Sequence, residues 1–176
     1  VGEHDLIREA LGTDAFGPDG LELGFWKIAM RPGKPLIFGH IGRTPLLGLP
    51  GNPVSTIVCG TIFLRPAIAT MLGRTGPHTT ILKARLAKPL KENDRRQDYL
   101  RAVYHLDQNG EALAEVFERQ DSSMLALLAE ANCLLIRPPH APAADAGHAD
   151  DDRRHDQRDD DHLQRIQEQF ADEIEH

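Results

Sequence analysis

Two loops rich in proline and glycine carry the side chains best suited to bind an oxyanion. They are Arg31-Pro-Gly-Lys-Pro35 and Gly48-Leu-Pro-Gly-Asn-Pro-Val-Ser55, and they start seventeen residues apart. Proline fixes φ and glycine permits conformations that other residues avoid. Arg31 and Lys34 supply positive charge, and Ser55 supplies a hydroxyl where a helix should begin and its N–H groups favour anions. The pair predicts an anion-binding mouth, with two plain turns between strands as the alternative.

An α/β layer is expected to position these loops. Strands are predicted by the apolar runs at 25–30, 36–38 and 45–49. A buried helix is predicted over 54–72, which Pro66 should kink or interrupt, and a short helix over 5–11. Strand–loop–helix order is typical of sheets that bind ligands at the loops after their strands.

The pattern becomes mostly β after Gly73-Arg-Thr-Gly-Pro77, which is the best candidate for a domain boundary. A hairpin is predicted over 99–117, because Asp107-Gln-Asn-Gly110 is a strong turn signal between two apolar runs. The other predicted elements are a strand over 80–87, a helix over 122–131 and a strand over 133–136.

Composition sets the limits on function. The 176 residues are 40% hydrophobic and 5% aromatic, which fits a globular body of one or two small domains. We expect no membrane segment, because we find no uninterrupted apolar run of spanning length. Cys59 and Cys133 lie in apolar contexts without metal-ligand spacing, so reduced thiols and a cytoplasmic location are expected.

The net charge of −7 comes from the end of the sequence. Residues 150–176 hold eleven Asp or Glu and four Arg, so the remaining residues balance to zero. A neutral body has no surplus of cations to neutralise phosphates, and we therefore expect no nucleic-acid partner. Any oxyanion site must be built locally. The acidic run itself is expected to be disordered.

The chain resembles the MoeA-type molybdopterin molybdenumtransferases, a family that includes the E domain of gephyrin. The resemblance rests on the runs Phe25-Trp-Lys-Ile-Ala-Met-Arg-Pro-Gly-Lys-Pro-Leu-Ile-Phe-Gly39 and Leu47-Gly-Leu-Pro-Gly-Asn-Pro-Val-Ser55. Val1-Gly-Glu-His-Asp5 is similar to the end of the family's glycine loop. The resemblance implies a C-terminal fragment: the second half of an α/β molybdopterin-binding domain over 1–74, a small β-barrel over 78–147, and an atypical acidic tail over 148–176.

The resemblance also implies a reaction. Family members insert molybdate into adenylylated molybdopterin, release AMP and use a divalent cation, usually Mg²⁺. The full-length form is expected to be a homodimer, and the fragment alone is expected to be inactive. A scaffold or receptor-anchoring module and a non-catalytic molybdopterin-binding domain are the alternatives.

The resemblance assigns candidate site residues. Asp5 would be a magnesium or nucleotide-side carboxylate, or only a helix N-cap. Arg31, standing where the family usually has lysine, and Lys34 would contact molybdate or phosphate. Arg96-Gln-Asp-Tyr-Leu-Arg101 is similar to the family's Arg-x-Glu-Phe-x-Arg strand, and Gln120-Asp-Ser122 to its Gln-x-Ser element. The expected cofactor-binding set is Pro35, Pro50, Gly51, Asn52, Pro53, Ser55, Arg101 and Ser122. For Ser55 and Ser122 a helix cap is the alternative role, and for Arg101 a place on the sheet surface.

Overall fold

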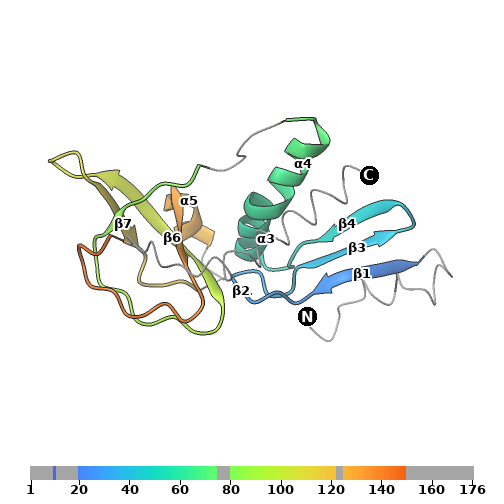
Figure 1. The fold of residues 1–176 in the computed structure, drawn as a ribbon, viewed down its shortest axis with the longest axis horizontal. Coiled ribbons are helices and arrows are strands. Elements are labelled where there is room, and N and C mark those ends of the chain that lie inside the picture. The colour runs from blue at the N-terminus through green and yellow to red at the C-terminus, as the bar shows by residue number, and fades with distance from the viewer. Residues whose placement is uncertain (1–9, 11–19, 75–79, 122–124, 150–176) are drawn as a thin grey trace.

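The computed structural model describes residues 10, 20–74, 80–121 and 125–149 (Figure 1). Its first sheet has the order β1-β3-β4, with antiparallel neighbours. The strands are β1 (Leu21–Trp26), β3 (Ile37–Ile41) and β4 (Thr44–Gly48). The predicted strand over 25–30 is wrong in its extent: β1 ends at Trp26 because Lys27 turns the chain with a positive φ of 66°. A separate two-residue strand, β2 (Met30–Arg31), follows.

One helical rod follows the second loop. It consists of α3 (Pro53–Cys59), the π-helical turn η2 (Gly60–Leu64) and α4 (Arg65–Met71). Pro66 has no N–H to donate, and the structure accommodates it with the π turn, in which the Arg65 N–H donates to the Gly60 carbonyl five residues back. The helix predicted over 54–72 is thus confirmed, and the turn of different pitch stands where an interruption was expected.

The same rod bears on the expectation that the chain has no membrane segment. Residues 53–71 form a helix long and apolar enough to cross a membrane by length and composition. The core helix of a globular protein passes the same test, and this one buries one side against the rest of the chain. Its buried side chains include Val54, Val58, Cys59, Phe63 and Ala67.

The second sheet is organised around the long strand β6 (Gln97–Leu106). β6 pairs antiparallel with β7 (Ala112–Val116) and with β8 (Cys133–Arg137), and parallel with β2. The short strand β5 (Arg85–Leu86) pairs parallel with β7. The predicted hairpin is confirmed, and its turn holds Gly110 at φ 81°. The strand predicted over 80–87 is reduced to two residues. The helix α5 (Leu125–Glu130) lies within the predicted 122–131.

The predicted fold class is confirmed in its coarser form. The described residues form two sheets, one of which mixes parallel and antiparallel pairs, and few helices. The closed barrel over 78–147 stays a prediction. The short helix over 5–11, apart from the helical Ala10, and the acidic tail from residue 150 lie outside the described residues.

Two hydrophobic clusters lie in the described residues: Phe38 packs with Ala67 in the smaller one, and the larger one joins the two sheets. Residues on either side of the first loop, Ile28, Met30 and Leu36, enter this larger cluster. They pack with Val58, Cys59 and Phe63 of the rod and with Tyr99 of β6. Leu128 of α5 and Leu134 of β8 pack against the same cluster. Cys59 is a free thiol without exposed surface, and burial raises its pKa to about 12. The rod, the first loop and β6 are therefore held as one packed unit.

Gly33 is the tightest point of this core. Its φ is +122°, and an added Cβ would lie 2.6 Å from Cys59 Sγ and 3.0 Å from Met30 Sδ. We expect Gly33→Ala to lower the free energy of unfolding by about 2–4 kcal/mol, because it adds backbone strain to overpacking. Gly51→Ala is the control, since no atom lies within 4 Å of its added Cβ. Urea unfolding of both variants checks this; equal stability would contradict it.

Candidate functional site at the junction of the two sheets

The first loop folds back on itself beneath the core. The Leu36 N–H donates to the Gly33 carbonyl at 2.9 Å, and the Ile28 N–H donates to the Lys34 carbonyl at 3.1 Å. With Gly33 buried against Cys59, these bonds fix the backbone on either side of Lys34. The Lys34 side chain is exposed. Its ammonium is thus a solvent-facing charge on a firmly shaped loop, as an anion contact requires.

The second loop ends in a well-formed helix start. Asn52 is the N-cap of α3, and its Oδ1 accepts from the N–H groups of Val54 at 3.1 Å and Ser55 at 3.2 Å. Pro53 occupies the first helical position, where its missing N–H costs nothing. The alternative role of Ser55 as a cap is therefore wrong, because Asn52 holds that place. Ser55 is instead a buried residue, 6% exposed.

Arg101 is a buried cation on the core side of β6. It is 2% exposed and lies two residues beyond Tyr99, so the two side chains share one face of the strand. Its Nε donates to Gln120 Oε1 at 3.3 Å, and its Nη2 donates to the Asp121 carbonyl at 3.0 Å. Burial lowers the pKa of its guanidinium, although the nearby Asp121 acts in the opposite direction. The alternative of a sheet-surface arginine is therefore wrong, and the expected role in binding stays a prediction.

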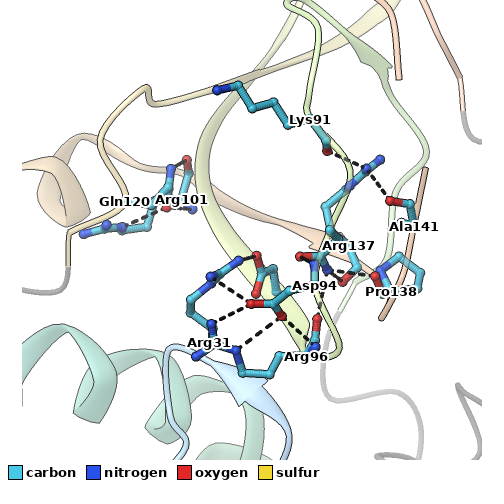
Figure 2. Close-up of polar contacts among 11 residues, drawn as sticks. Arg31, Lys91, Asp94, Arg96, Arg101, Gln120, Arg137, Pro138 and Ala141 are labelled. Atoms are coloured by element: carbon cyan, nitrogen blue, oxygen red, sulfur yellow. Dashed lines mark hydrogen bonds and ion pairs between the residues drawn. The ribbon is translucent and has the colours of Figure 1, made fainter. Parts of the chain in front are cut away.

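Gln120 holds the segment after β7 against β6. Its Oε1 also accepts from the Arg101 N–H at 2.9 Å, and its Nε2 donates to the carbonyls of Arg101 at 3.0 Å and Phe117 at 2.9 Å. Figure 2 shows the paired side chains. One amide therefore fixes both the buried arginine and the chain that leads to Ser122. Its place in the Gln-x-Ser element was the available signal, yet nothing in its local pattern distinguishes it from its neighbours.

Arg31 lies on the opposite face of β6 from Arg101. In the parallel ladder Arg31 is the register partner of Asp98, which lies three residues before Arg101, and an odd separation reverses the face of a strand. The Arg31 guanidinium forms ion pairs with Asp98 through Nη2 and with Asp94 through Nη1, the latter at 3.4 Å (Figure 2). The residues expected to converge on one anion thus divide between two faces.

A second arginine completes this acidic cluster. Arg96 Nη2 donates to Asp94 Oδ2 at 2.7 Å, and the Arg96 N–H donates to Asp94 Oδ1 at 2.8 Å. These bonds, led by the side-chain contact, hold the pKa of the Asp94 carboxyl well below its usual range, and they raise the pKa of Arg96. Asp94 and Asp98 are therefore occupied by arginines.

Two candidate residues cannot be placed. Asp5 and Ser122 lie outside the described residues. Among the residues that the structure does describe, no three His, Cys, Asp or Glu side chains lie close enough together to hold a metal ion. Of the expected set, Lys34 and Pro35 lie on the first loop and Arg101 lies on β6, and the core cluster packs residues beside that loop against β6 and the rod. The loop of Pro50, Gly51, Asn52, Pro53 and Ser55 leads into the capped start of α3 on the same rod.

Two family models match the chain in sequence order. Residues 1–70 match a probable molybdopterin binding domain, and residues 83–149 match the MoeA C-terminal region, domain IV. The chain belongs to the MoeA family. The core described above contains side chains from both matched segments.

Relatives agree with this family, and a solved structure agrees with the fold. Molybdopterin molybdenumtransferase 1 of Mycobacterium tuberculosis is 38% identical over 126 residues, 68% of this chain and 30% of the relative. The Haemophilus influenzae molybdopterin molybdenumtransferase is 31% identical over 77% of this chain and 32% of its own length. A molybdopterin biosynthesis moeA structure from Pyrococcus horikoshii OT3 has a TM-score of 0.59 at 23% identity, over 78% of this chain and 32% of its own. The chain spans about a third of the length of these relatives.

The N-cap gives a direct test of the second loop. Asn52→Ala should lower the free energy of unfolding by about 1 kcal/mol, because the Val54 and Ser55 N–H groups lose their acceptor. Asn52→Asp should keep nearly all of the stability, since aspartate caps as well as asparagine. Thermal unfolding measures both. An unchanged midpoint for Asn52→Ala would show that the loop does not depend on this cap.

Proposed function

We propose that the chain is part of an enzyme of molybdenum cofactor biosynthesis that inserts molybdate into adenylylated molybdopterin and releases AMP. The observation that carries this is the pair of family matches together with relatives named molybdopterin molybdenumtransferase at 31–38% identity. Because the chain spans about a third of those relatives, the activity is proposed for a longer protein that contains it. The chain alone is proposed to be inactive.

Cations at the junction support an oxyanion substrate. Molybdate and the adenylylated molybdopterin are both anions, so a site that joins them must offset negative charge. Lys34 offers an exposed ammonium on a shaped loop, and Arg101 offers a buried guanidinium that Gln120 and the Asp121 carbonyl hold in place. We propose Lys34 and Arg101 as the oxyanion contacts.

The second loop is proposed to hold the pterin substrate by shape. Pro50 and Pro53 limit the backbone, Gly51 is exposed with open space around it, and the cap at Asn52 fixes where the helix begins. Pro35 limits the first loop in the same way. A loop without backbone freedom presents its N–H groups without an ordering cost on binding. Ser55 and Ser122 are proposed as further contacts of this kind.

Magnesium is proposed to act through Asp5. The described residues hold no cluster of three or more His, Cys, Asp or Glu side chains that could form a metal site by themselves, and Asp94 and Asp98 are bound by arginines. Mg²⁺ in nucleotide enzymes is often held by one or two carboxylates and by the substrate's phosphates, which a single aspartate can satisfy. The homodimer and the cytoplasmic location are proposals as well, and light scattering of the full-length protein would test the first.

Removing the Lys34 charge tests the oxyanion contact. In a full-length form, Lys34→Ala should raise the molybdate concentration for half-maximal cofactor formation by about tenfold or more, while thermal stability changes little, because an exposed loop lysine contributes little to folding. Arg43→Ala is the matched control: Arg43 is also an exposed loop cation, at the β3–β4 turn. A normal molybdate dependence for Lys34→Ala would reject the assignment.

Magnesium titration tests Asp5. Asp5→Asn should lower turnover by about tenfold and recover part of it at raised Mg²⁺, because the amide is a weaker ligand than the carboxylate. If Asp5 only caps a helix, asparagine should replace it well. Turnover equal to that of the unmodified protein at every Mg²⁺ concentration would therefore leave only the cap.

A further inference from the structure

We propose that Arg31 is a positioning residue rather than an oxyanion contact: its ion pair with Asp98 is a latch that holds the Lys34 loop against β6. The inference rests on the proposed function only for its catalytic consequence. The ion pairs that form the latch are seen in the described structure. The latch consists of Arg31 on β2, Asp98 on β6, and Asp94 in the turn before β6.

The main-chain pairing of β2 with β6 is too short to hold the register by itself. β2 contributes only two residues to the parallel ladder, Met30 opposite Gln97 and Arg31 opposite Asp98. The Gln97 N–H donates to the Ala29 carbonyl at 2.9 Å just before it. A ladder this short has little stability of its own, so side chains must hold the register. On one face Met30 enters the core, and on the other face Arg31 meets Asp98.

Asp98 is a buried carboxylate that needs a partner. The Asp98 side chain is 4% exposed, whereas the Arg31 side chain is 46% exposed. A buried carboxylate needs a partner, and within the described residues Asp98 Oδ1 has no hydrogen-bond donor at all, which leaves Arg31 on Oδ2 as its direct partner. Arg96 adds only its electrostatic attraction. Asp98 thus requires Arg31, and the requirement fixes where the backbone of residue 31 lies.

Arg31 is close enough to Lys34 along the chain to fix the position of the first loop. Only Pro32 and Gly33 separate Arg31 from Lys34, and Gly33 is wedged against Cys59. The loop is therefore held at two points, by the latch at residue 31 and by the core at residue 33. Arg101 stands three residues beyond Asp98 on the same strand. The latch consequently sets the spacing between the two cations that are proposed to bind one anion.

Variants that change the side-chain lengths of Arg31 and Asp98 test the latch. Lysine is shorter than arginine, and glutamate is one methylene longer than aspartate, so Arg31→Lys and Asp98→Glu each disturb the fit while the double variant restores the combined length. The reporters are the amide exchange rates of Gln97 and Leu36, which donate to Ala29 and Gly33 beside the latch. Asp98→Asn, which keeps the shape and removes the charge, is a further variant that should fold readily.

The expected result is a local loosening. Asp98→Asn and each single length change should speed exchange at Gln97 and Leu36 by about tenfold, and Arg31→Lys/Asp98→Glu should recover most of the protection. The amide of Ala87, which donates to the Ala114 carbonyl at the far side of the sheet, should not change. Lys88→Met is the control variant, because it removes the Lys88–Glu115 ion pair from the same sheet and should leave Gln97 and Leu36 unchanged. Unchanged exchange in all three latch variants would overturn the latch.

The catalytic consequence has a separate readout. In a full-length form the length-changing single variants should raise the KM for molybdate several-fold with a smaller effect on kcat, and the double variant should restore it. Loosened amides with an unchanged KM would show a purely structural pair and overturn the positioning role. Direct anion contact by Arg31 predicts instead that Asp98→Glu gives no rescue, so that the double variant has the same KM for molybdate as Arg31→Lys alone. Absence of any molybdate use by the unmodified protein would count against the proposed function, while the exchange rates would still decide the latch.

Discussion

The parallel pairing of β2 with β6 is the contact on which the rest of the structure depends. It joins the segment matched to the molybdopterin-binding domain to the segment matched to the MoeA C-terminal region. Met30 on one face packs in the core with Cys59, Phe63 and Tyr99, and Arg31 on the other face forms an ion pair with Asp98. Two residues of strand thus connect the rod, the first loop and the second sheet, and the stability of that joint comes from side chains.

The two arginines at this joint illustrate how partners decide what a cation can do. Arg101 is buried deeply, and its described side-chain bonds go to the Gln120 amide oxygen and to the Asp121 carbonyl. Arg31 is half exposed, and its guanidinium forms ion pairs with Asp98 and Asp94. Exposure alone would have favoured Arg31 for anion binding, whereas its two carboxylate partners favour the positioning role proposed above.

Much of the fold could be predicted from the sequence, because much of it is local. The hairpin around Asp107–Gly110, the strand at 133–136 and the long helix after Pro53 follow from turn residues and apolar runs within a few residues of each other. Errors arose where distant contacts override the local pattern. The run 25–30 looks continuous but is broken at Lys27, and 80–87 alternates like a strand but finds a partner only at Arg85 and Leu86 in the ladder with β7.

The sequence by itself determined the family, the order of the two matched segments and the residue types available for oxyanion binding, because these depend on identity and spacing along the chain. Only the tertiary structure decided which of them act together. Arg31 and Asp98 appeared in the sequence as two unrelated departures from a motif, sixty-seven positions apart, and the fold makes them one ion pair. For Arg101 a place on the sheet surface was the alternative to a site role, and the fold buries it and bonds it to Gln120. The physical reason is that ion pairing and burial depend on distances through space, which strand register sets and sequence separation does not.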